Sequence, residues 1–316
     1  DRLCHNHEAF SSFGLNKMEE KAQSPNNRCC LFCPNHELGW HYQDVGRGRP
    51  LILLHGIGMS HVAWKKVIQN LANERRVLAF DIAGFGITPP VPDNIQPTPA
   101  NLLAGIGSLA ESISRIDDEG QISRDHECLD IVGNSLGGYL ALEAAKLGKL
   151  GCFRVNSIAA ISPAGLWKKN YPLRSVLVLQ LTRLGVRRLP RLTRALLRRQ
   201  YTRKLMMAVP VSTNVSEEDA CELVNIFASA PIFASKVAFK KFRESMKDPF
   251  MGGRSISKNT RVTIAFGKRD WLLPPRARLR HEIPAEVNWQ NQEGWGHVPM
   301  WDDPEGVTKF ILESTS

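Results

Sequence analysis

The sequence lacks a long hydrophobic segment. Its longest apolar runs, such as residues 175–181, are far shorter than the roughly 20 residues that a membrane-spanning helix requires. The first 30 residues are polar and contain no apolar core of the kind found in secretory signals. From these two absences we expect a soluble, cytoplasmic protein.

The seven cysteines form no regular framework. Because their number is odd and their spacing irregular, the sequence argues against a disulfide scaffold. Cys30, Cys33 and His36 have the spacing of metal ligands, but a clean second ligand pair is missing. We therefore predict no metal site, and we expect residues 1–37 to form a flexible N-terminal extension.

Acidic residues are absent from a long internal segment. Between Ala144 and Ser216 there are fifteen Lys or Arg residues and no Asp or Glu, whereas the whole chain has a net charge of +10. Residues 173–203 interleave these charges with leucines. Three interpretations stay open: a basic amphipathic surface that contacts anionic lipid, a region that attracts acidic substrates, or a solvated surface whose leucines pack on the core. We expect no nucleic-acid partner, because no nucleic-acid-binding module is visible.

Predicted strands alternate with predicted helices along most of the chain. Apolar runs at residues 51–54, 76–80, 128–132, 156–161 and 261–267 are typical of buried strands, and residues 62–71 and 101–116 have helical patterns. This alternation predicts an α/β fold with a mostly parallel sheet and helices on both faces. It stops between about residues 163 and 248, where the composition favours helices.

A serine lies at the junction of a predicted strand and a predicted helix. Residues 133–137 read GNSLG, follow the strand at 128–132 and precede a run of helix-forming residues. The pattern G-x-S-x-G in this context is typical of a nucleophile elbow, where glycines let the strand and the helix approach each other. The helix N-terminus favours negative charge beside the serine. We therefore predict that Ser135 is a nucleophile.

An acid and a histidine follow two later predicted strands. Asp270 comes just after the strand at 261–267, and His297 follows a predicted strand at 287–290. Because the carboxyl ends of parallel strands meet at one edge of a sheet, we expect Ser135, Asp270 and His297 to lie together.

From about residue 38 to the end, the chain resembles the α/β-hydrolase family. The motifs that carry the resemblance are HG at 55–56, DIAGFG at 81–86, GNSLGG at 133–138, GKRD at 267–270 and GHVP at 296–299. The resemblance implies an α/β-hydrolase fold with a core formed by residues 38–163 and 249–316. It also implies a helical cap, residues 164–248, inserted after the sixth strand.

The resemblance implies a role for each site residue. His297 is expected to take the proton of Ser135 as general base, and Asp270 to hold the His297 tautomer. Backbone N–H groups of Leu136 and Ile57 are expected to form the oxyanion hole. Asp302 and Asp303 are competing acids, but they follow the histidine and so break the expected order.

Five further residues lie within or next to these motifs. Asn134, Trp271 and Trp295 are candidate substrate-binding residues, with a structural role for the asparagine and ordinary core packing for the tryptophans as alternatives. We expect His55 and Asp81 to hold neighbouring loops together.

The function predicted from these residues is that of a serine hydrolase. We expect it to cleave carboxylic esters of small lipophilic molecules through an acyl-enzyme, without a cofactor. One alternative is a carbon–carbon hydrolase of the meta-cleavage type, although such relatives usually carry a longer loop than IGMS at residues 57–60. Epoxide hydrolases and haloalkane dehalogenases of this fold use Asp where the chain has Ser135. The other alternative is a ligand-binding protein that keeps the triad but turns over slowly.

Overall fold

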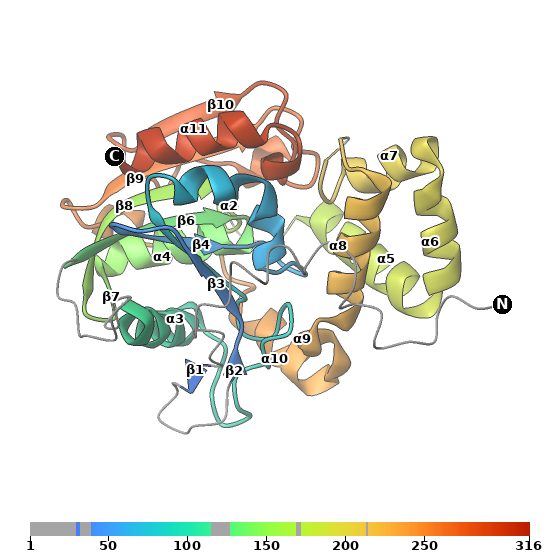
Figure 1. Cartoon of the computed structure of the whole chain (residues 1–316), viewed down its shortest axis with the longest axis horizontal. Helices are drawn as coiled ribbons and strands as arrows, with labels where there is room; N and C mark the ends of the chain where they lie inside the picture. Colours follow the sequence, from blue (N-terminus) through green and yellow to red (C-terminus); the bar gives the residue numbers. More distant parts are fainter. Residues whose placement is uncertain (1–29, 32–38, 115–126, 169–171, 213) are drawn as a thin grey trace.

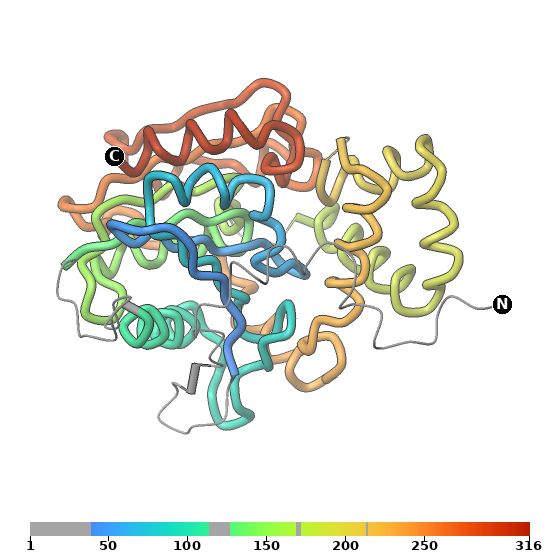
Figure 2. The backbone as a smooth tube through the Cα atoms, viewed as in Figure 1, coloured from blue at the N-terminus to red at the C-terminus, as the bar shows by residue number. Residues whose placement is uncertain are grey.

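A computed structural model describes residues 30–31, 39–114, 127–168, 172–212 and 214–316 (Figures 1 and 2). Cys33 and His36 of the metal-like motif, and most of the predicted N-terminal extension, lie outside these residues. Within the described ranges, no cluster of three or more His, Cys, Asp or Glu side chains is arranged to hold a metal ion. No helix in these ranges is both long enough and apolar enough to span a bilayer.

A mostly parallel sheet forms the centre of the molecule. Its path runs β10-β9-β8-β6-β4-β5-β3, and β7 pairs with β8 beside this path. The strands are β3 (Tyr42–Val45), β4 (Pro50–Leu54), β5 (Arg76–Phe80), β6 (Cys128–Asn134), β7 (Lys149–Leu150), β8 (Phe153–Ile161), β9 (Arg261–Gly267) and β10 (Asn288–Gln292). Only the pairs β3–β5 and β7–β8 are antiparallel in this sheet. The sheet predicted from the sequence is therefore confirmed.

Residues 39–45 form two short strands in place of one continuous strand. β2 (Gly39–Trp40) pairs with the short strand β1 (Cys30–Leu31) in a separate sheet, and β3 continues into the main sheet. The division falls at His41, whose N–H donates to Oγ1 of Thr88 at 2.8 Å. A side-chain acceptor thus replaces a strand partner at this point, which an alternating sequence pattern does not reveal.

Helices cover both faces of the sheet. α2 (Lys65–Ala72) packs with α11 (Pro304–Thr315), and α3 (Pro99–Ser114) packs with α4 (Leu136–Leu147) on the other side (Figure 1). With both faces covered, the central strand β4 is buried along its whole length. This explains its uninterrupted apolar sequence, because a strand buried on both faces has no exposed positions for polar residues.

Among the described residues, six α-helices are inserted between β8 and β9, and β8 is the sixth strand of the sheet in chain order. They are α5 (Leu173–Arg188), α6 (Pro190–Arg198), α7 (Gln200–Ala208), α8 (Glu217–Ser229), α9 (Pro231–Ala234) and α10 (Lys236–Ser245). Figure 1 shows α5 to α8 at the end of the molecule opposite β7. The inserted helical region predicted from the sequence is therefore present, and we call these six helices the cap.

Candidate active site

Ser135 lies on the sharp turn between β6 and α4. Its φ of 54° and ψ of −110° place it in a backbone region that non-glycine residues seldom adopt. A Cβ atom on Gly133 would lie 2.1 Å from the Gly137 carbonyl oxygen, and one on Gly137 would lie 2.1 Å from the Leu54 carbonyl oxygen. The two glycines of the motif are therefore required for the strand, turn and helix to pack this closely.

His297 and Asp270 form a buried hydrogen-bonded pair. Nδ1 of His297 donates to Oδ2 of Asp270 at 2.9 Å, and each residue is only 3% exposed. The other carboxylate oxygen accepts the N–H groups of Leu272 and Leu273, each at 3.0 Å. A proton held on Nδ1 leaves Nε2 of His297 free to accept a proton, as a general base requires.

The environment keeps Asp270 ionised. Burial by itself raises the pKa of Asp270, but the charge and hydrogen bond of His297, the Leu273 N–H and the Arg278 guanidinium outweigh burial and hold this pKa below its ordinary value. Arg278 also donates to the carbonyl oxygens of Leu273 at 2.6 Å and Gly267 at 3.0 Å. Arg278 thus holds the loop after β9 that carries Asp270, a role that no sequence motif indicates.

The two competing acids bond elsewhere. Asp302 accepts the hydroxyl of Ser212, and it accepts the Gly296 N–H at 2.7 Å. Asp303 accepts Nε1 of Trp295 at 3.0 Å and caps α11. Asp270 is therefore the carboxylate that pairs with His297, in the order expected from the sequence.

The loop after β4 is held beside the nucleophile by His55. Nε2 of His55 accepts the Ile82 N–H at 2.9 Å, so Nδ1 carries the proton and donates to the Gly56 carbonyl at 2.7 Å. Burial lowers the pKa of His55 to about 4, which keeps the ring neutral at physiological pH. A Cβ atom on Gly56 would lie only 3.3 Å from Cβ of Ser135.

The two predicted oxyanion donors flank the serine. Leu136 is the first residue of α4, and Ile57 follows Gly56 in the loop after β4.

Asp81 holds the adjoining loops, since it accepts the N–H of His61 at 2.7 Å and of Ile87 at 3.3 Å. This is the loop-holding role that we expected for Asp81.

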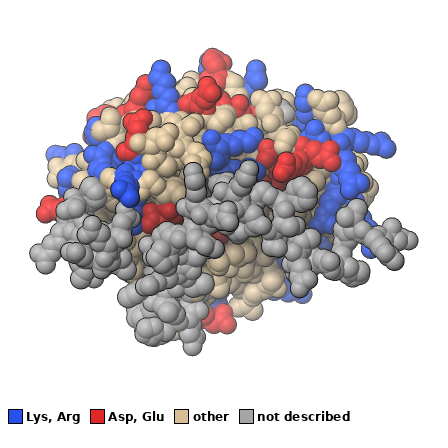
Figure 3. Space-filling model, in the orientation of Figure 1, with Lys and Arg blue, Asp and Glu red and all other residues tan. Residues whose placement is uncertain are grey.

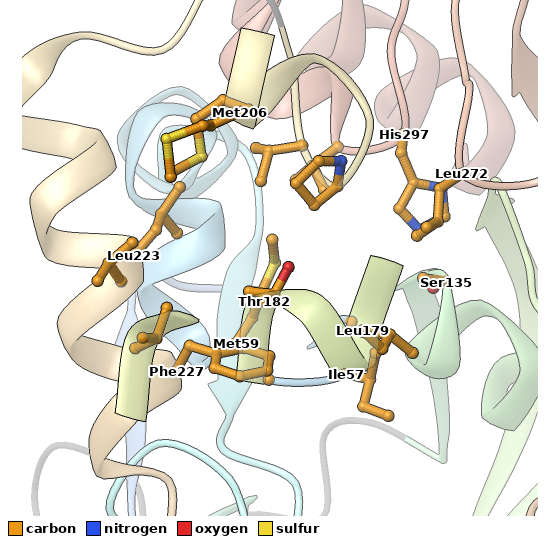
Figure 4. Close-up of a pocket in the computed structure, with 18 of the residues that line it drawn as sticks. Ile57, Met59, Ser135, Leu179, Thr182, Met206, Leu223, Phe227, Leu272 and His297 are labelled. Atoms are coloured by element: carbon orange, nitrogen blue, oxygen red, sulfur yellow. The ribbon is translucent and has the colours of Figure 1, made fainter. Parts of the chain in front are cut away.

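An apolar cavity of about 130 Å³ opens at Ser135 and His297 (Figure 4). Its apolar walls come from the loop after β4 and from the cap. They include Ile57, Met59, Leu179, Met206, Leu223 and Phe227. None of the described residues that line the cavity is Asp, Glu, Lys or Arg. A ligand in this cavity therefore meets mostly apolar side chains. The polar ones are Ser135, His297 and Asn134 at one side, and Thr182 and Thr193 in the cap.

Asn134 lines the cavity but also has a structural role. Nδ2 of Asn134 donates to the carbonyl oxygens of Ile161 at 3.2 Å and His297 at 2.9 Å. Oδ1 of the same amide is buried and has no hydrogen-bond partner among the residues that the structure describes. Both interpretations of Asn134 are therefore compatible with the structure. Its amide nitrogen holds the His297 loop, which is a structural role, and the residue borders the cavity where a substrate would lie.

The two tryptophans lie outside the cavity. The side chain of Trp271 is 54% exposed, whereas Trp295 is buried against Phe310 with ring centroids 5.6 Å apart. Neither is among the residues that line the cavity. Trp295 therefore packs in the core, which was the alternative interpretation. Neither tryptophan is placed to contact a ligand at Ser135. Adjacency in sequence to Asp270 and His297 does not fix the direction of these side chains.

Comparisons with known proteins all point to the same family. Residues 51–310 match the alpha/beta hydrolase family. An epoxide hydrolase, EphH, from Mycobacterium tuberculosis is 28% identical over 215 residues, which cover 64% of this chain and 91% of that protein. A 2-hydroxy-6-oxo-2,4-heptadienoate hydrolase from Pseudomonas putida is 36% identical over 105 residues, which cover 32% of this chain and 34% of that protein.

The solved structures agree on the fold. A thermophilic esterase from Thermogutta terrifontis superposes with a TM-score of 0.62 at 19% identity, covering 90% of this chain and 95% of that one. At this identity the likeness speaks for the fold alone. Because the family match spans most of the chain and the elbow, acid and histidine stand in the family's order, this protein belongs to the alpha/beta hydrolase family.

Proposed function

We propose that this protein is a serine hydrolase that cleaves carboxylic esters of small lipophilic molecules. Ser135 attacks the ester carbonyl while His297 takes the hydroxyl proton, and the oxyanion is held by the N–H groups of Leu136 and Ile57. Collapse of this intermediate releases the alcohol, which receives the proton from His297. Water activated by His297 then attacks the acyl-enzyme, and the acid leaves while Ser135 regains its proton.

One observation carries this proposal: the buried His297–Asp270 pair and Ser135 open onto a cavity without charged walls. A neutral ester loses little hydration on entering such a cavity, whereas an unpaired charge pays a large desolvation cost. The acyl part of a lipophilic ester gains from contact with walls such as Leu179 and Phe227.

The same observation ranks the alternative reactions. The name of the Pseudomonas putida relative describes a carboxylate substrate, which needs a cationic or strongly donating partner when buried. In the part of the chain that the structure describes, no Lys or Arg lines this cavity, so a meta-cleavage substrate is the second candidate. It is supported by the GNSLGG elbow and the local identity to that relative. Epoxide opening is disfavoured because the nucleophile position holds Ser135 in place of an aspartate.

The test is hydrolysis of p-nitrophenyl esters from acetyl to palmitoyl. A cavity of about 130 Å³ holds roughly ten water-sized groups, so we expect an optimum near an acyl chain of roughly eight carbons. Ser135→Ala should lower kcat by at least about 10³-fold. The matched control is Ser162→Ala, because Ser162 is the other described non-glycine residue with positive φ, is also buried and does not line the cavity.

Two outcomes contradict the proposal. Equal losses for Ser135→Ala and Ser162→Ala would mean that the elbow serine is not the nucleophile. Absence of turnover on every ester, together with cleavage of a meta-cleavage product, would assign the site to carbon–carbon hydrolysis. Tight binding of these compounds without turnover would assign it to a ligand-binding protein.

A further inference from the structure

Helix α5 carries apolar side chains on two opposite faces. Leu179 and Val186 on its inner face line the catalytic cavity. Leu173, Leu177 and Leu184 on its outer face are 74%, 55% and 55% exposed, at spacings of four and seven residues that place them in one row. A surface helix normally turns polar residues outward, so packing among the described residues does not explain this outer row.

The row belongs to a larger exposed apolar surface. Of the fourteen large apolar side chains that are exposed in the described residues, nine lie in the first three cap helices and the turn between α5 and α6. They are Leu173, Val176, Leu177, Leu181, Leu184, Leu189, Leu192, Tyr201 and Leu205. Six leucines of residues 173–203, for which packing on the core was one interpretation, are therefore exposed. Exposed apolar surface concentrated in this way is typical of an interaction site.

This surface is strongly basic. Residues 173–208 contain ten Lys or Arg and no acidic residue. Six of these side chains make no hydrogen bond, ion pair or ring contact with the chain as far as the structure describes it: Arg174, Arg188, Arg191, Arg198, Arg199 and Lys204. Figure 3 shows Lys and Arg side chains at the right-hand edge, where Figure 1 places α6 and α7. The charge is thus available to an anionic partner.

The basic residues also line a hollow at the C-terminal end of the leucine row. We call it the basic hollow; its volume is about 360 Å³, and its walls include Arg183, Leu184, Arg187, Arg188, Phe233 and Lys236. No acidic residue lines it. Leu184 belongs to both the hollow and the leucine row, so the two features are continuous.

Two of the four basic side chains in the hollow are held in place. The guanidinium of Arg183 lies 4.5 Å from the centre of the Phe239 ring, and Arg187 donates to the carbonyl oxygen of Phe233. Arg188 and Lys236 are exposed and unpaired among the described residues. Guanidinium and ammonium groups arranged in this way suit the oxygens of a phosphate group.

We propose that this face of the cap docks on an anionic phospholipid bilayer, with the leucine row entering the apolar layer and the basic hollow binding a lipid phosphate. A soluble anion would use the charges but would leave the exposed leucines without a partner. Apolar and basic groups on one face are the two components of peripheral membrane binding. Docking would let a lipophilic ester pass from the bilayer along α5 into the catalytic cavity, and this consequence rests on the proposed function. The docking itself does not depend on that function.

The test is flotation of the full chain with vesicles of phosphatidylcholine alone or mixed with phosphatidylserine. We expect binding to the mixed vesicles only, and equal binding by Ser135→Ala, which separates docking from catalysis. The pair Arg188→Glu and Lys236→Glu should lower the partition coefficient by at least about tenfold. Lys149→Glu with Lys258→Glu is the matched control, because both residues are exposed and adjoin β7, at the other end of the molecule.

The leucine row has its own matched pair. Leu177→Ser should weaken binding by about tenfold, while Leu147→Ser, equally exposed at 55% but at the end of core helix α4, should leave it unchanged. Absence of binding to the mixed vesicles, or equal losses in test and control variants, would overturn the proposal. Binding of soluble glycerol phosphate to the hollow without vesicle binding would assign the hollow to a free phosphate ligand and would also overturn it. Circular dichroism of each variant checks that it is folded.

Discussion

The side-chain amide of Asn134 joins the nucleophile elbow to the loop of the general base, because its Nδ2 donates to the carbonyl oxygen of His297 at 2.9 Å. Since Asn134 directly precedes Ser135, this hydrogen bond ties the backbone of His297 to the residue beside the proposed nucleophile. We therefore expect Asn134 to act on the reaction as a positioning residue, through His297.

Replacement of Asn134 by alanine should lower kcat by about 10- to 100-fold, because displacement of a catalytic group by about 1 Å costs on that order. KM should change much less, and steady-state kinetics on a soluble ester would measure the two separately. Asn156→Ala is the control, since Nδ2 of Asn156 makes a comparable 2.9 Å bond to Asp130 away from the cavity. An equal fall in kcat in both variants would show that the loss comes from general destabilisation.

Asp270→Asn should lower kcat by about 10⁴-fold, because an amide in place of the carboxylate favours the wrong tautomer of His297. Asp302→Asn tests the neighbouring acid, whose oxygens bond to Ser212 and Gly296. We expect that variant to lose stability while keeping most of its kcat. Ester hydrolysis by purified proteins of verified fold would decide, and a larger loss for Asp302 would contradict the assignment of the acid.

The buried ring of His55 should make stability depend on pH. Its pKa falls from 6.5 to about 4 in the folded chain, chiefly because of burial. Between these values the unfolded chain binds a proton that the folded chain does not, so the free energy of unfolding rises with pH. Above pH 6.5 the residue contributes no pH dependence, and towards pH 4 it costs on the order of 3 kcal/mol.

Urea denaturation across this pH interval would measure the effect. His55→Gln keeps an N–H donor for Gly56 and an acceptor for Ile82 but cannot be protonated, so its unfolding free energy should vary less steeply with pH than that of the wild type. Equal slopes in the two proteins would locate the acid sensitivity elsewhere.

The sequence predicts the triad because each of its residues follows a strand. Ser135, Asp270 and His297 come after β6, β9 and β10, and parallel strands place such positions along one edge of the sheet whatever the intervening loops do. The inserted helices are also predictable, since the alternation of strands and helices stops there. The family's motifs then distinguish Asp270 from Asp302 by their order.

The walls of the cavity are less predictable. They depend on which face of each cap helix turns inward, and α5 is apolar on both faces, so its hydrophobic pattern alone does not identify Leu179 as inward and Leu177 as outward. Trp271 and Trp295 show the same limit in loops, where sequence position gives no side-chain direction. The hydrogen bond from Asn134 to His297 is equally hard to predict, because it joins segments that are distant in the sequence.

The two apolar faces of α5 offer a protein engineer two independent controls on one short segment. Substitution of Leu179 or Val186 reshapes the cavity without altering the exposed row, and substitution of Leu173 or Leu177 alters that row without touching the cavity. Libraries randomised at helical spacing could therefore select for chain-length preference and for surface behaviour separately, and the best members of each could be combined.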